Sequence, residues 1–101
     1  MRAVRFLLPA EVEMLEAAIF YETRVNGLGD RFLARVESAV YHVAYHPQAC
    51  PIVRDHIRKR LVYGFPYAVL YRIDPDEIVI VAVMHQRRRP DYWLERIADR
   101  R

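Results

Sequence analysis

The chain has 101 residues, of which 53% are hydrophobic and 29% are charged, a composition typical of a soluble globular protein. This length supports one two-layer core and excludes a second, so we expect residues 1–101 to form a single domain. No apolar run reaches the ~18 residues of a membrane span, and the N-terminus lacks the uninterrupted apolar core of a signal peptide, so we expect a cytoplasmic protein without a membrane partner. The single cysteine, Cys50, excludes an internal disulfide framework.

The net charge is only +3, but the charges are unevenly distributed. Residues 11–22 carry four glutamates and no basic residue, whereas Arg87, Arg88 and Arg89 are consecutive. A concentrated positive field attracts a polyanion or an acidic protein. The sequence therefore predicts an acidic helix and a basic binding end.

The first half of the chain predicts a strand followed by two helices. Arg2–Leu8 is apolar enough for a short strand that Pro9 ends, and the apolar spacing over Ala10–Val25 is that of an amphipathic helix. Its apolar residues form two adjacent stripes, namely Val12, Leu15, Ala18 and Ile19 beside Met14, Ala17, Tyr21 and Val25. Asn26-Gly27 stops this helix.

We expect a second helix to begin after Gly29 with Asp30 as its cap and to end at His46-Pro47. Its predicted buried stripe consists of Phe32, Leu33, Val36, Val40, Val43 and Ala44. The connection between the helices is so short that they must pack as an antiparallel hairpin.

The second half predicts a meander of strands. Ile52–Arg60 is a ragged edge strand, and Leu61–Ile73 has large apolar residues at every odd position, which is the period of a strand. The turn Asp74–Glu77 leads into Ile78–Met84, which is apolar on both faces and indicates a central strand.

The helices and strands fit an α+β fold of two layers, in which the helical hairpin covers one face of the sheet. Val69 and Tyr71 should face the helices, against Val36 and Val40. Because the helices cover only one face, we expect the other face of Ile78–Met84 to be an exposed interface. A short helix is expected within residues 91–101, where Trp93, Leu94, Ile97 and Ala98 have helical spacing.

In this order and spacing, the chain resembles the RelE/ParE superfamily of bacterial type II toxins. The residues that carry the resemblance are Phe20-Tyr21, Gly29-Asp30-Arg31-Phe32, His46-Pro47, Arg60-Leu61-Val62, Phe65-Pro66-Tyr67, Leu70-Tyr71-Arg72-Ile73, Val83 to Pro90, and Tyr92-Trp93. The resemblance implies a β-α-α-β-β-β order in which the first strand lies beside the last. It also implies a role such as plasmid stabilisation and a hetero-oligomer with a cognate antitoxin.

The superfamily includes two mechanisms, because RelE-like toxins cut mRNA on the ribosome whereas ParE-like toxins poison DNA gyrase. Arg58, Arg60 and Arg87 match basic positions of the RelE-like site, if one insertion is allowed. Ala68 replaces an expected arginine, and Trp93 replaces an expected tyrosine although Tyr92 is adjacent. These two departures favour the ParE-like mechanism.

His85 keeps the ribonuclease alternative open, because its near-neutral pKa suits a general acid or base beside the arginines. The candidate catalytic residues are His85, Arg87, Arg60 and Arg58, and the candidate binding residues are Arg72, Arg88, Arg89, Tyr92 and Trp93. No histidine and cysteine spacing resembles a metal site, and no cofactor is predicted. An inactive relative that only binds antitoxin is the third alternative.

Overall fold

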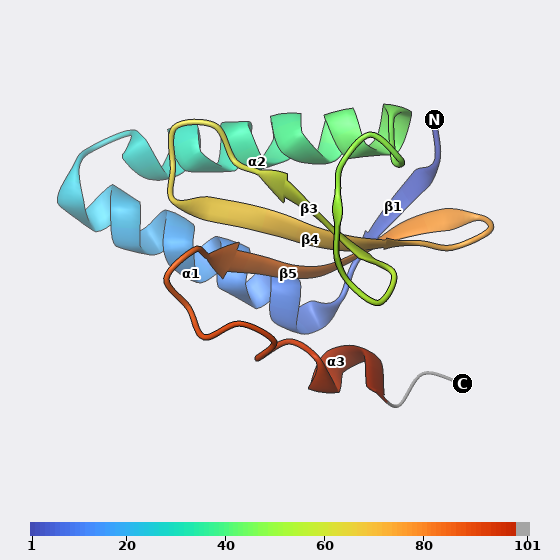
Figure 1. Cartoon of the computed structure of the whole chain (residues 1–101). Coiled ribbons are helices and arrows are strands. Elements are labelled where there is room, and N and C mark those ends of the chain that lie inside the picture. Colours follow the sequence, from blue (N-terminus) through green and yellow to red (C-terminus); the bar gives the residue numbers. More distant parts are fainter. Residues whose placement is uncertain (99–101) are drawn as a thin grey trace.

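The computed structural model describes residues 1–98 and has the α+β architecture that the sequence predicts (Figure 1). The elements in chain order are β1 (Ala3–Phe6), α1 (Leu8–Arg24), α2 (Leu28–Tyr45), β2 (Ile52–Arg54), β3 (Ile57–Leu61), β4 (Tyr67–Ile73), β5 (Glu77–His85) and α3 (Glu95–Ala98). The prediction of a short C-terminal helix is confirmed by α3, while residues 99–101 of the predicted segment lie outside the described residues.

The five strands form one sheet in the order β1-β5-β4-β3-β2. β1 pairs with β5 in parallel, from Ala3 beside Glu77 to Phe6 beside Ile80, and the other neighbouring strands are antiparallel. All residues of Ile78–Met84 are buried. The predicted central strand and the predicted position of the first strand beside it are both confirmed.

The prediction of one continuous strand over Leu61–Ile73 is wrong, because a turn divides that segment into the end of β3 and the whole of β4. Gly64 has a φ of +84°, a conformation that glycine adopts without strain. Pro66 has no N–H to donate to a strand ladder. The Val62 N–H donates to the carbonyl of Tyr67 at 2.9 Å and closes the turn. The alternation of apolar residues therefore continues through the sequence, although the strand itself is interrupted at the turn that contains Gly64 and Pro66.

The helical hairpin depends on a close approach at the start of α2. Gly27 is the N-cap with a φ of +85°, and the Glu22 carboxylate accepts the N–H groups of Gly27 and Gly29, both at 2.8 Å. The side chain that caps α2 is therefore Glu22 from α1. The prediction that Asp30 would be the cap is wrong. A Cβ on Gly29 would clash with the carbonyl oxygen of Ala18, so a glycine is required where the helices meet.

The main core lies between the helical hairpin and one face of the sheet. Val69 and Tyr71 are fully buried in it together with Val36, and Val40 packs at its edge. The predicted face assignment is confirmed. The Tyr71 hydroxyl donates to the carbonyl of Pro47 at 2.6 Å, which satisfies a polar group that burial would otherwise leave unpaired.

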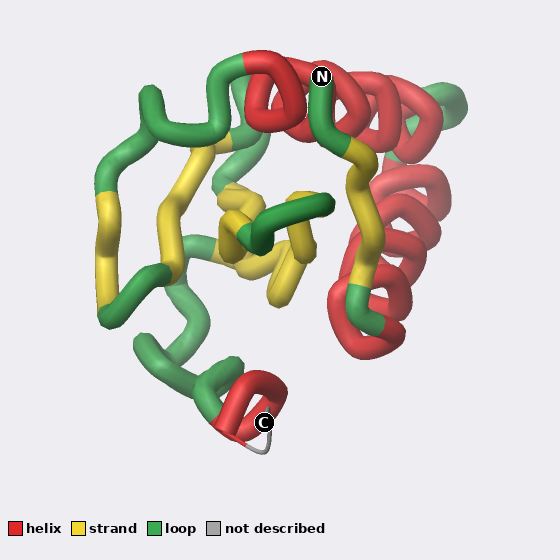
Figure 2. The backbone as a smooth tube through the Cα atoms, turned by 90° about the vertical axis from the view of Figure 1, so that its right-hand side faces the viewer, coloured by secondary structure: helices red, strands yellow, loops and turns green. Residues whose placement is uncertain are grey.

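The opposite face of the sheet is covered by the C-terminal segment rather than exposed. Trp93 packs there with buried residues of three strands, namely Ile57, Leu70, Val81, Ala82 and Met84. Figure 2 shows α3 apart from the two long helices, which lie together on their own side of the strands. The prediction of an exposed strip along Ile78–Met84 is wrong, because residues 92–97 supply the missing layer.

The two apolar stripes predicted for α1 have different environments. The buried positions of α1 are Ala10, Ala17 and Ala18, with Met14 and Tyr21 packed against the core. Val12, Leu15 and Ile19 are instead exposed on the outside of the molecule. A helix at the edge of a two-layer domain has only one side to bury, and the small alanines allow that side to approach closely. Within residues 1–98, no helix is long and apolar enough to span a membrane.

Candidate functional site

The end of β5 forms a tight basic turn. His85 is the last strand residue, and its carbonyl accepts the N–H of Arg88 at 2.9 Å while its Nδ1 accepts the N–H of Arg87 at 3.0 Å. Because Nδ1 acts as an acceptor, a neutral His85 ring carries its proton on Nε2. The ring stacks edge-on to Tyr67, with 5.1 Å between centroids, and borders a cavity of about 250 Å³ between α1 and β5.

The three consecutive arginines after β5 are all exposed. The guanidinium of Arg88 lies 3.9 Å from the ring centroid of Tyr92 and 3.7 Å from the Glu13 carboxylate. Within residues 1–98, no hydrogen bond or ion pair holds the side chain of Arg87 or Arg89. Two guanidinium groups are thus available to a partner at this turn.

Arg58 and Arg60 lie on β3 and share the helix-facing side of the sheet, because they pair with Tyr71 and Val69. Arg58 donates to the carbonyl of Cys50 at 2.6 Å and so ties β3 to the preceding loop. Arg60 borders an open cavity of about 880 Å³, and its buried Nε has no partner among the described residues.

The structure brings only part of the predicted site together. Gln86 lines the cavity of Arg60, whereas the preceding His85 lines the cavity beside α1. Arg60 and the basic turn are therefore near neighbours that border different cavities. Arg72 lies at the opposite end of the β4–β5 hairpin, where it binds the Asp74 carboxylate at 2.8 Å.

The two predicted aromatic binding residues have structural contacts. Trp93 is 3% exposed and belongs to the second core cluster. The Tyr92 hydroxyl donates to Glu13 at 2.6 Å, and burial, with this hydrogen bond, raises the pKa of Tyr92. In this structure the hydroxyl of Tyr92 is engaged within the protein.

Glu13 is the residue at this site that the sequence analysis missed. Its carboxylate accepts the N–H of Val83 at 3.0 Å, the hydroxyl of Tyr92, and the Arg96 guanidinium at 2.7 and 2.9 Å. Arg96 also donates to the carbonyl of Val81. β1 pairs only with the first half of β5, so the backbone of the second half has no partner strand on that side. Glu13 and Arg96 instead bind the N–H of Val83 and the carbonyl of Val81 there. One glutamate on an acidic helix gives no sequence signal for this role.

Burial acts to raise the pKa of the Glu13 carboxyl, but the hydrogen bonds from Arg96, Tyr92 and Val83 outweigh it and the pKa is lowered. Glu13 is therefore a charged acceptor that joins α1 and β5 to the C-terminal segment. Among residues 1–98, no cluster of three or more histidine, cysteine or acidic side chains could hold a metal ion.

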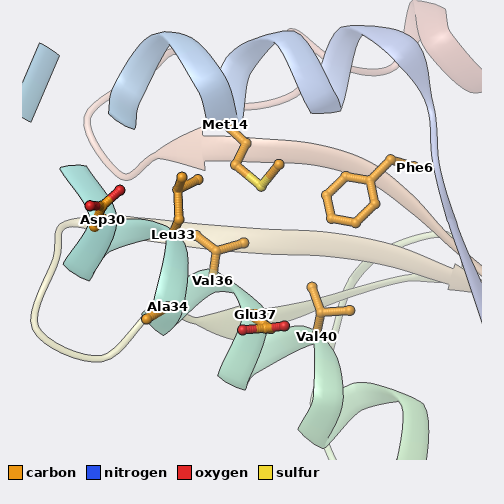
Figure 3. A pocket seen from close by; sticks show the side chains of 8 residues that line it. All are labelled: Phe6, Met14, Asp30, Leu33, Ala34, Val36, Glu37 and Val40. Carbon is orange, nitrogen blue, oxygen red and sulfur yellow. The ribbon is translucent and has the colours of Figure 1, made fainter. Parts of the chain in front are cut away.

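A separate apolar groove runs between α1, α2 and β1. It has a volume of about 470 Å³ and is lined mainly by apolar side chains, with two acidic residues beside them: Phe6, Met14, Asp30, Leu33, Ala34, Val36, Glu37 and Val40 (Figure 3). Met14 and Phe6 come from one side of the groove and the α2 residues from the other. This shape and composition suit an apolar segment with basic flanks.

The fold is similar to that of a solved chain from a toxin–antitoxin system. The structure superposes on a solved chain described as "Chromosomal ParDE TA system from P. aeruginosa" with a TM-score of 0.69, covering 84% of this chain and 96% of that chain at 14% sequence identity. At this identity the likeness concerns the fold alone.

Residues 4–90 match the family model described as ParE toxin of type II toxin-antitoxin system, parDE. The chain therefore belongs to the ParE toxin family, and its partner is an antitoxin. No curated protein sequence matches the chain.

Proposed function

We propose that this toxin inhibits growth by binding a protein target, DNA gyrase, and that it catalyses no reaction of its own. The observation that supports this proposal is the state of the positions that a RelE-like ribonuclease would use. Ala68 is fully buried where an arginine is expected, Arg58 is bound to a backbone carbonyl, and Tyr92 donates to Glu13. Metal-free RNA cleavage needs several cations and a proton donor at the reacting phosphate, and of the matched basic positions Arg58 is bound while Arg60 and Arg87 have no ion pair with a described residue.

The basic turn after β5 is the proposed surface for the target. Arg87 and Arg89 are exposed and unpaired within the described residues, and a guanidinium binds a carboxylate or phosphate through two parallel hydrogen bonds. The exposed glutamates of α1, Glu11 and Glu16, would repel such groups. The charge distribution therefore favours the basic turn after β5 as the part of the toxin that contacts an acidic or nucleic-acid-bearing target.

We further propose that a segment of the antitoxin occupies the groove between α1, α2 and β1. Leu33, Val36 and Val40 offer apolar contact along one side of α2, and Asp30 and Glu37 can pair with basic residues of the segment. The groove and the basic turn after β5 consist of different residues, so binding at one surface does not require side chains of the other.

A ribonuclease is the second candidate because His85 borders a cavity and its Nε2 has no hydrogen-bond partner among residues 1–98. The test measures two activities of the purified toxin: inhibition of supercoiling by gyrase, and cleavage of mRNA on ribosomes. We expect the toxin to inhibit supercoiling by gyrase, and we expect His85→Gln to change this inhibition little. If mRNA is cleaved and His85→Gln lowers the rate by ~10²-fold or more, the chain is a nuclease that uses His85 as an acid or base.

Replacing Arg87 by alanine should abolish growth inhibition while leaving the fold and antitoxin binding intact. The side chain is exposed and makes no contact with the core, so its removal should change stability by less than about 0.5 kcal/mol. Growth after induction at equal expression, together with the affinity for the antitoxin, measures the effect.

Leu33→Asp provides the matched control at the other surface. Leu33 lines the groove and is partly exposed, so aspartate there should weaken antitoxin binding and leave gyrase inhibition unchanged. Full toxicity of Arg87→Ala would place the target surface elsewhere. If the antitoxin neutralises the Leu33→Asp variant as well as it neutralises the parent, the antitoxin does not bind in the groove.

A further inference from the structure

The outer side of α1 carries an apolar stripe that nothing in the described chain covers. Leu8, Val12, Leu15 and Ile19 are 70%, 42%, 46% and 63% exposed. Successive residues of a helix are turned by about 100°, so these four lie together on the side of α1 opposite Ala10, Ala17 and Tyr21, which face the core. The stripe extends for ~16 Å at 1.5 Å per residue.

The spacing and residue types of this stripe are those of a two-helix interface. The four residues follow one another at intervals of four, three and four, which is the heptad pattern of positions d, a, d and a. Both a positions are β-branched, Val12 and Ile19, and both d positions are leucine. This combination favours the pairing of two helices.

The charges beside the stripe determine what kind of helix can pair with it. In this heptad Glu11 occupies position g and Glu16 occupies position e, one on each flank, and both are exposed. The other two glutamates of α1 have internal partners, Glu13 with Arg96 and Glu22 with the N-terminus of α2. Flanking charges at e and g select the partner helix.

A second copy of α1 is a poor partner. In a parallel pair Glu11 of one copy would lie beside Glu16 of the other, and in an antiparallel pair each glutamate would lie beside its own counterpart. Both arrangements bring like charges together. A helix with lysine or arginine at its flanking positions would instead form ion pairs on both sides.

We propose that the outer side of α1, defined by Leu8, Val12, Leu15 and Ile19, is a docking surface for an amphipathic helix of a partner protein that carries basic residues beside its apolar stripe. None of these four residues lines the groove that holds Met14 or the cavity beside the basic turn after β5, and only the flanking Glu16 borders that cavity, together with His85 and Arg88. The proposal therefore does not depend on the target or on the position of the antitoxin.

The test uses two labelled three-heptad peptides that have isoleucine at a and leucine at d. One peptide has lysine at every e and g position and the other has glutamate, so that like charges keep each peptide from pairing with itself. Binding to the full chain, made by cell-free synthesis, is followed by fluorescence anisotropy. We expect the lysine peptide to bind at least about tenfold more tightly, with a difference that shrinks in high salt.

Two variants of the chain connect the binding to this surface. Replacing Leu15 and Ile19 together by serine should lower the affinity of the chain for the lysine peptide at least about tenfold. Tyr41→Ser, which removes a side chain that is 59% exposed on α2, is the matched control and should have no effect. Replacing Glu11 and Glu16 together by lysine should reverse the preference between the two peptides.

The proposal is overturned if the two peptides bind equally or if neither binds. It is also overturned if sedimentation shows that the chain alone is a dimer that Leu15→Ser converts to a monomer, because a second copy would then cover the stripe. All substituted residues are exposed, and an unchanged thermal unfolding midpoint verifies that each variant is folded.

Discussion

The Val69→Asp variant should fail to fold. Val69 is fully buried on the helix-facing side of β4, between β3 and β5, and packs in the cluster that includes Phe32 and Val36. The cross-strand neighbour Arg60 lies on the same face and offsets only part of the cost of burying an aspartate in this apolar layer, so we expect a loss of at least about 4 kcal/mol. A domain of this size is stable by only about 5–15 kcal/mol. Circular dichroism during heating would show the loss of the cooperative transition.

The same substitution at Val53 is the control. Val53 is 47% exposed on the short edge strand β2, so Val53→Asp adds the same charge to the same residue type in a strand without burying it. Its unfolding midpoint should stay near that of the parent. A cooperative transition for Val69→Asp close to the parent midpoint would mean that this position does not face the helices in solution.

The Glu13→Gln variant should lose roughly 3 kcal/mol of stability at neutral pH. Glutamine has nearly the same volume but no charge, so the Arg96 guanidinium loses its counter-ion in a largely buried position. The hydrogen bonds from Tyr92 and Val83 also lose a charged acceptor. Denaturant unfolding of parent and variant measures the difference.

This stability difference should depend on pH in a defined direction. The folded-state pKa of Glu13 is lowered from its ordinary value of 4.5, so its contribution is fully present above that value and is lost as the pH falls through the lower folded value. The parent and Glu13→Gln should therefore converge in acid. Glu16→Gln, on the exposed side of the same helix, should match the parent throughout. A pH-independent gap between the parent and Glu13→Gln would show that the charge of Glu13 is not responsible.

Regular hydrophobic patterns predicted most of the fold. The apolar run Ile78–Met84 indicated a central strand, and the alternation that includes Val69 and Tyr71 identified the helix-facing side of β4. Both follow from local periodicity, which one sequence contains in full. The same alternation concealed the break between β3 and β4, although Gly64 and Pro66 are the residues that signal a turn.

The layers that involve distant segments were harder to predict. The apolar residues of α1 form two stripes of similar strength, so periodicity alone does not tell which one faces the sheet. Likewise, Trp93 was expected at a binding surface but fills the second core, because a short irregular segment can cover a sheet without helical periodicity. The contacts of Glu13 join residues about 70 or more positions apart, and no local pattern records them.

The parallel pairing of β1 with β5 has a consequence for how the toxin is made. β1 is synthesised first among the strands, but the strand beside which it lies in the sheet is the last of the five. Throughout translation of the helices and of β2, β3 and β4, the backbone of β1 has no strand to pair with. Long-range pairing of this kind makes folding slow, because a large loop must close before the contact stabilises it. The complete sheet, and with it the basic turn that follows β5, can exist only after β5 has been synthesised.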